Sequence, residues 1–241
     1  MTNNNPTLND EVFERAQRDA GVASPPMTMA GFLTKTGVLF ALLLATAGLG
    51  WTMPSGGALI GTLIGGFIVA LVVSFVPKTA PYLAPVYALL EGYVVGAISL
   101  MFAKQYNGLV PIAILLTLGV FVSMYGLWAT NIIRVTSTFV SVVLGATIGI
   151  AITYAFTLIG GMWLPGLNAL PIYQSGAIGI AFSLFVVVVA ALNLALDFQL
   201  VQTGIESRAP KYMEWYAGFG LMVTLVWLYI SMLRLLGKLR N

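Results

Sequence analysis

Seven long apolar runs follow one another along most of this chain. Each is close to the length of about 20 helical residues that crosses a bilayer core about 30 Å thick. Turn-forming residues, chiefly Pro, Gly and Asn, separate the runs. The runs therefore predict an all-α fold, a polytopic membrane protein whose bundle of seven transmembrane helices lies in a lipid bilayer. The expected helices lie approximately at residues 33–52, 57–76, 82–103, 109–130, 139–161, 177–198 and 214–236.

The composition agrees with a membrane domain and excludes several classes of enzyme. Of the 241 residues, 59% are apolar and 8% are charged, whereas a soluble domain carries about 25% charged residues. The chain has no Cys and no His, which excludes thiolate nucleophiles, His-dependent serine proteases and zinc hydrolases. Its eleven Lys and Arg are scattered singly, which does not suit nucleic-acid binding. We therefore expect a protein that is not an enzyme, with no catalytic residue, resident metal, cofactor or nucleic-acid partner.

The N-terminal segment differs from the rest of the chain. It is polar, carries both signs of charge and ends in Pro25 and Pro26. It lacks the order of charge, apolar core and cleavage site that marks a signal peptide. We expect a mobile cytoplasmic tail at residues 1–31, followed by the seven-helix transmembrane domain at residues 32–241.

The orientation in the membrane follows from the basic residues in the loops, because these favour the cytoplasmic side. A cytoplasmic N-terminus puts one basic residue, Lys104, in the outer loops, and the C-terminal Arg234, Lys238 and Arg240 also fall outside after a seventh crossing. Either the earlier helices fix the topology, or the last helix crosses incompletely and its end returns inside. The same orientation places seven basic residues on the inner side: Arg15, Arg18, Lys35, Lys78, Arg134, Arg208 and Lys211.

Several glycines lie inside the apolar runs. Small residues let helices approach closely in a membrane, so packing is their expected role. These glycines are Gly96, Gly119, Gly145, Gly149, Gly179 and Gly218.

Two carboxylates are expected inside the membrane. Glu91 lies about 14 Å of helical rise into the third run. If the sixth helix continues to Glu206, Asp197 lies about 13 Å from its end. An ionisable residue at that depth is costly and usually faces a cavity or a partner. We therefore expect Glu91 and Asp197 to line one cytoplasm-facing cavity, where they share a proton and act as a pH gate.

Structural roles for these acids remain open beside the gate. Each carboxylate could be solvated separately, or tied to Lys78 or Arg134 as a basic partner. Asn193, four residues before Asp197, shares its helix face and either donates to the carboxylate or bonds to a neighbouring helix. Glu214, at the start of the last helix, is expected at the membrane interface, where its charge complements the helix N-terminus.

The residues Ala190 to Leu239, with the segments LNLALDFQLVQTGIE and APKYMEWY, resemble the Bax inhibitor family, also called the transmembrane BAX inhibitor motif family, and especially its bacterial branch. Two further segments support the resemblance, PYLAPVYALLEG at Pro81 to Gly92 and PPMTMAGFLTKTG near the start. Together with the seven runs, the resemblance covers about four-fifths of the chain. It implies a multi-pass protein of the bacterial plasma membrane.

The resemblance also implies a function and a gate. Members of the family are associated with pH-sensitive calcium leak, and a carboxylate on the sixth helix pairs with one on the seventh. Asp197 matches the first of these positions, whereas the second falls on Ser231, whose hydroxyl can hydrogen-bond but cannot share a titrating proton as a carboxylate does. Lys78 roughly matches the family's basic latch after the second helix, and Glu91 becomes the replacement partner for Asp197.

Two functions remain open at this point. The first is a cation leak channel for calcium, whose oxygen-ligand preference suits carboxylates, gated by protonation of Asp197 with Glu91. The second is a non-transporting membrane protein that binds and regulates other membrane proteins, such as a quality-control protease. Calcium flux in proteoliposomes distinguishes the two.

Overall fold

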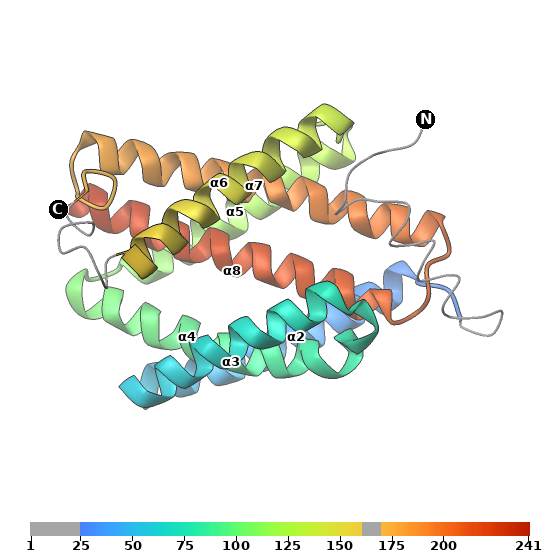
Figure 1. The fold of residues 1–241 in the computed structure, drawn as a ribbon, viewed down its shortest axis with the longest axis horizontal. Coiled ribbons are helices and arrows are strands. Elements are labelled where there is room, and N and C mark those ends of the chain that lie inside the picture. Colours follow the sequence, from blue (N-terminus) through green and yellow to red (C-terminus); the bar gives the residue numbers. More distant parts are fainter. Residues whose placement is uncertain (1–24, 161–169) are drawn as a thin grey trace. The chain divides into compact units, whose positions relative to one another are not determined.

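The computed structural model describes residues 25–160 and 170–241. Seven long helices follow one another through these residues, with one short 3-10 turn between the second and the third (Figure 1). The predicted mobile tail falls mostly on residues 1–24, which lie outside the described residues. The helices are α2 (Met29–Thr52), α3 (Gly56–Phe75), η1 (Pro77–Thr79), α4 (Ala80–Gln105), α5 (Leu109–Ala129), α6 (Ser137–Gly160), α7 (Ala177–Glu206) and α8 (Met213–Arg240).

The prediction of seven membrane-spanning helices is confirmed. In the described part of the chain, 7 helices are long and apolar enough to cross a membrane. Most helix ends lie within a few residues of the predicted ones, because Pro and Gly turns separate the runs. The larger differences are that α2 begins at Met29 and that α7 continues to Glu206.

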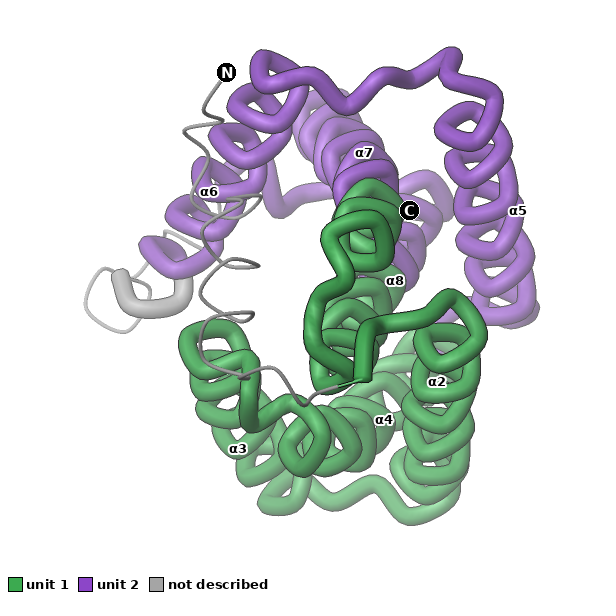
Figure 2. Tube along the Cα trace, turned by 90° about the vertical axis from the view of Figure 1, so that its right-hand side faces the viewer, with its two compact units in different colours: residues 1–104, 197–226 green, residues 105–196, 227–241 purple. Residues whose placement is uncertain are grey.

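The chain folds into two compact units (Figure 2). The first unit contains residues 1–104 and 197–226, and therefore α2, α3, most of α4, the end of α7 and the first half of α8. The second contains residues 105–196 and 227–241, and therefore α5, α6, most of α7 and the second half of α8. Each unit is described by itself below.

Close contact between α2 and α4 holds part of the first unit together. Gly92 and Gly96 lie four residues apart on α4 and so share one helix face. A Cβ at Gly92 would overlap the Leu43 carbonyl oxygen, and one at Gly96 would overlap the Ala47 carbonyl oxygen, both on α2. Only glycine lets the two backbones come this close, as small residues do between membrane helices.

The predicted packing role of the other glycines is supported at some positions only. A Cβ at Gly218 would meet the Thr36 hydroxyl oxygen of α2 at 2.8 Å, a contact between helices. One at Gly179 would overlap the Gln174 carbonyl oxygen, which lies in the connection before α7 and not on another helix. At Gly119, Gly145 and Gly149, by contrast, an added Cβ meets no atom of the described residues within 4 Å.

In the second unit, α6 and α7 pack through an apolar cluster. Its buried members are Ile150 of α6 with Val186 and Val189 of α7. Trp227, on the second half of α8, packs against the same cluster. Burial of these side chains in contact with one another stabilises the unit through close packing, as expected between membrane helices.

The end of α8 makes polar contacts with the ends of other elements in the second unit. Arg240 donates to the Asn107 carbonyl oxygen at 2.5 Å, and the Tyr106 hydroxyl donates to Asn241 at 2.8 Å. Lys238 donates to the Ile172 carbonyl oxygen at 2.7 Å. The end of α8 therefore lies beside the α4–α5 turn, as expected if α8 crosses the membrane completely.

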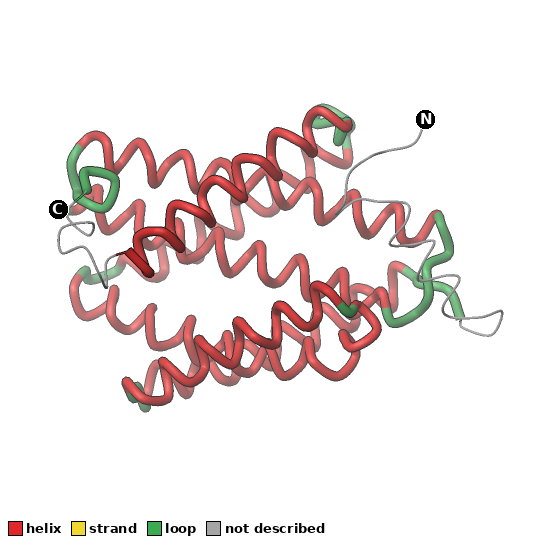
Figure 3. The backbone as a smooth tube through the Cα atoms, in the orientation of Figure 1, coloured by secondary structure: helices red, strands yellow, loops and turns green. Residues whose placement is uncertain are grey.

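Short connections join most helices (Figure 3). The segment before α2 is held by the α7–α8 connection of the same unit: the Met27 amide donates to the Ala209 carbonyl oxygen at 2.7 Å, and the Lys211 amide donates to the Pro25 carbonyl oxygen at 3.0 Å. Met27 is buried. The last residues of the predicted tail are thus fixed against the start of α8.

Candidate functional site

Asp197 lies within α7, about two and a half turns before the helix ends, because the helix continues beyond the apolar run to Glu206. The residue is half-buried in the first unit. Its Oδ2 atom is buried and has no hydrogen-bond partner among the described residues. A buried carboxylate oxygen without a partner is costly, so this atom is an unusual feature that structural packing alone does not require.

One face of α8 lies beside the Asp197 carboxyl group. Thr224 hydrogen-bonds to Asp197, and a Cβ added at Gly220 would lie 3.6 Å from Asp197 Oδ1. Tyr216 interacts electrostatically with Asp197. Tyr216, Gly220 and Thr224 are spaced four residues apart, which puts them on one helix face. A small residue between two hydroxyl-bearing ones leaves room for the carboxyl group.

Glu91 has a separate set of neighbours. The Tyr87 hydroxyl, one turn earlier on α4, hydrogen-bonds to its carboxyl group. A Cβ added at Gly66 of α3 would lie 3.7 Å from Glu91 Oε2. The Tyr87 ring packs edge-on against Phe219 of α8, with ring centroids 5.0 Å apart. Glu91 is therefore half-buried between α3 and α4 and has a hydroxyl partner.

The two carboxylates thus have different contacts within the first unit. Glu91 contacts Tyr87 and lies near Gly66, whereas Asp197 contacts Thr224 and lies near Gly220. A cavity shared by Glu91 and Asp197 stays a prediction, and so does the sharing of a proton.

The basic residues considered as partners lie at connections between helices. Lys78 is in the 3-10 turn η1 of the first unit. Arg134 is exposed between α5 and α6, in the second unit. Their pairing with Asp197 or Glu91 stays a prediction.

Asn193 bonds to a neighbouring helix, which is one of the two roles considered for it. Its side-chain amide nitrogen donates to the Thr147 hydroxyl of α6 at 2.9 Å and to the Val189 carbonyl oxygen at 2.8 Å. An amide nitrogen has two protons, so neither is left for Asp197. Asn193 therefore ties α7 to α6 within the second unit.

The sequence analysis did not identify the hydroxyl group that contacts Asp197. Thr224 supplies it, seven residues before Ser231 on α8. Ser231 is 4% exposed and belongs to the second unit, and its predicted contact with Asp197 stays a prediction. The spacing of Tyr216, Gly220 and Thr224 is a signal that could have identified the face.

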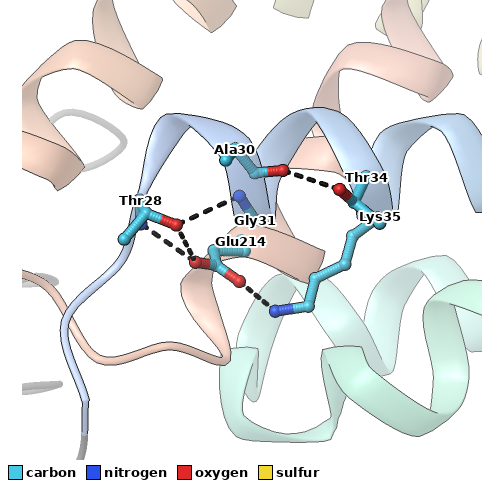
Figure 4. A network of polar contacts seen from close by, with 6 residues as sticks. All are labelled: Thr28, Ala30, Gly31, Thr34, Lys35 and Glu214. Atoms are coloured by element: carbon cyan, nitrogen blue, oxygen red, sulfur yellow. Dashed lines mark hydrogen bonds and ion pairs between the residues drawn. The ribbon is translucent and has the colours of Figure 1, made fainter.

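Glu214 is fixed by the start of α2 (Figure 4). It is in the first turn of α8, as expected for an acid that complements a helix N-terminus. Its side chain is 0% exposed. Oε1 accepts hydrogen bonds from the Thr28 amide at 2.9 Å and the Thr28 hydroxyl at 3.1 Å, and Oε2 forms an ion pair with Lys35.

Gly31 makes this network possible. A Cβ at that position would overlap the Glu214 carboxyl group. Thr28 also caps α2, because its hydroxyl accepts a hydrogen bond from the Gly31 amide at 3.0 Å. The sequence indicated the position of Glu214 but not its partners, which lie far away along the chain.

Metal-binding side chains do not gather in the described residues. No group of three Asp or Glu lies together there, and the chain has no His or Cys.

Comparison with protein families gives one match that covers almost the whole chain. The family model described as Bax inhibitor 1 like matches residues 5–241. A search of curated proteins finds no match. The resemblance of Ala190 to Leu239 to this family is confirmed, and the match extends it to α2 through α6. The chain is a membrane-integral protein with seven candidate spans, and it belongs to the Bax inhibitor 1-like family.

Proposed function

We propose that this protein is a pH-sensitive leak channel for cations, with calcium as the ion, gated by protonation of buried carboxylates. Asp197 is the gate residue, and Glu91 is the second acid whose protonation contributes. The protein performs no chemistry on a substrate. It is a multi-pass protein of the bacterial plasma membrane with its N-terminus in the cytoplasm.

The observation that supports this proposal is the unpartnered oxygen of Asp197. A carboxyl group inside a membrane helix usually faces a cavity or a partner. Thr224 provides one hydrogen bond, but Oδ2 is buried without a partner among the described residues. Binding or loss of one proton therefore changes both the charge and the hydrogen bonds at the contact of α7 with α8, which is what a gate operated by pH requires.

Flux of calcium into proteoliposomes tests the proposal. We expect the wild-type protein to conduct calcium with a rate that depends on pH, because the charge of Asp197 changes. Asp197→Asn removes the titrating proton but keeps the shape of the side chain, so its flux should lose most of the pH dependence. Glu206→Gln is the matched control, since Glu206 is an exposed acid at the end of the same helix.

Glu91→Gln and Thr224→Val extend the test. Glu91→Gln should shift the pH profile if the second acid contributes to the gate. Thr224→Val removes the hydroxyl partner of Asp197 and should also shift the profile, whereas Thr224→Ser keeps the hydroxyl and should restore it. A pH dependence that persists in Asp197→Asn would contradict the assignment of the gate. Absence of calcium flux at every pH would favour the second function, regulation of other membrane proteins.

A further inference from the structure

An open cavity of about 150 Å³ lies at the turn between α2 and α3. Its walls are mainly apolar and come from Pro54, Leu59, Leu100 and Met101, and Lys104 is the one charged residue among its lining residues. All of these residues belong to the first unit. The cavity is separate from the neighbours of Asp197 and Glu91.

The cavity is at the membrane edge. Gly56, which lines it, is the first residue of the membrane-spanning α3, and Lys104 is next to the last residue of the span that ends at Gln105. Met101 is 63% exposed on the outer surface of the span. At this level of the span we expect the cavity to meet lipid headgroups.

Lys104 has no acidic residue near it along the chain. No Asp or Glu occurs between Glu91 and Asp197. Glu91 itself is thirteen residues earlier on the same helix, which corresponds to about 20 Å of helical rise. At the membrane edge the abundant anion is the phosphate of a lipid headgroup, and basic pockets between membrane helices bind such headgroups.

We propose that this cavity binds one anionic phospholipid. The phosphate lies against the Lys104 ammonium group, and the chain next to the headgroup lies against Leu59, Leu100 and Met101. The volume is well below the roughly 300 Å³ of a pocket that encloses a small ligand. Only the part of the lipid beside the headgroup therefore enters, while its acyl tails stay in the bilayer.

Ser55 adds a second polar group at the site. It lines the cavity and precedes α3. Its amide donates to the Tyr93 hydroxyl at 2.8 Å, and its side chain makes no capping bond to α3. The Ser55 hydroxyl can therefore donate to a phosphate oxygen beside Lys104.

Native mass spectrometry of the delipidated full-length protein tests the site. The protein in detergent is titrated with phosphatidylglycerol and with phosphatidylcholine that carry the same acyl chains. We expect one phosphatidylglycerol to bind more tightly than phosphatidylcholine. Lys104→Met should weaken phosphatidylglycerol binding about fivefold, the effect of one surface cation on an anionic lipid. Lys211→Met removes an exposed lysine that does not line the cavity and should leave binding unchanged.

A pair of glycine variants tests the cavity without changing charge. A Cβ at Gly56 or at Gly57 meets no described atom within 4 Å, so both positions have room for the first atom of a side chain. Thermal unfolding of Gly56→Leu and Gly57→Leu checks that both variants fold. Only Gly56 lines the cavity, so only Gly56→Leu should weaken binding of phosphatidylglycerol.

Two results would overturn the proposal. One is equal affinity for phosphatidylglycerol in Lys104→Met and Lys211→Met, which would show that Lys104 does not hold the phosphate. The other is displacement of phosphatidylglycerol by inorganic phosphate, which would mean that the cavity takes a free anion and the apolar walls do not contribute. Neither result depends on whether the protein conducts calcium.

Discussion

At the scale of single residues, two acids of the first unit, Glu214 in the first turn of α8 and Asp197 inside α7, have opposite environments. Glu214 is fully buried with a hydrogen-bonding hydroxyl, an amide and a cation around it. Asp197 has one hydroxyl partner and one buried oxygen without any among the described residues. A satisfied acid holds structure in place, whereas an incompletely satisfied one is able to respond to a proton or a cation. This contrast separates the structural acid from the candidate gate.

Glu214 should therefore contribute strongly to stability. Glu214→Ala leaves the Thr28 amide and the Lys35 ammonium group without their partner, and we expect the free energy of unfolding to fall by about 3 kcal/mol, as for other broken buried pairs. Glu214→Gln keeps an acceptor for Thr28 and should cost less. Thermal unfolding of the purified protein in detergent measures both changes.

The exposed Glu206 is the control for this series. Gln202 donates to it at 2.6 Å, but both side chains are exposed, and exposed pairs contribute little. Glu206→Ala should thus unfold close to the wild-type temperature.

Combining Lys35→Met with Glu214→Gln should recover part of the stability that Glu214→Gln loses, since no unpaired cation remains. If Glu214→Ala and Glu206→Ala unfolded at the same temperature, the network would have no structural role.

At the scale of helices, glycines with the same appearance in the sequence have different surroundings. Gly96 contacts the backbone of α2, whereas Gly145 on α6 has no atom of the described residues near the position of a Cβ. Gly96→Ala should lower stability by about 1–3 kcal/mol, because the methyl group forces two helices apart. Gly145→Ala should raise the free energy of unfolding by up to about 1 kcal/mol, because Ala is the better helix former.

Unfolding of both variants in the same detergent measures the difference. The sign is the important result, since a general effect of replacing glycine would move both variants in one direction. Equal destabilisation by Gly96→Ala and Gly145→Ala would contradict the close contact of α2 with α4.

The helices were predictable from the sequence, but their facing surfaces were not. Lengths of apolar runs and the turns between them fix where each helix begins and ends. In a membrane the outward face of a helix is also apolar, so hydrophobic periodicity does not show which residues face a neighbour. For this reason Asp197 was identified by its charge, while Thr224 was missed among apolar neighbours. The partners of Glu214 were missed because Lys35 lies 179 residues away.

At the scale of the whole molecule, the contacts at the end of α8 bear on the topology that the basic residues left open. Asn241 accepts a hydrogen bond from Tyr106 at the α4–α5 turn, and Arg240 donates to Asn107 there. A last helix that crossed only partly would not bring Asn241 to this turn. We therefore predict that Asn241 and the α4–α5 turn lie on the same side of the membrane, as a complete seventh crossing requires.

The absence of Cys makes this topology directly measurable, because each introduced cysteine is the sole thiol. In intact cells, a membrane-impermeant maleimide should label Asn107→Cys and Asn241→Cys, since both lie outside if the N-terminus is cytoplasmic. Glu206→Cys, at the exposed end of α7, should be labelled only after permeabilisation. If Asn241→Cys, like Glu206→Cys, is labelled only after permeabilisation, α8 returns to the inner side. Reversal of the whole pattern would instead retain the seven crossings and place the N-terminus outside, because the three sites would keep the same relation to one another.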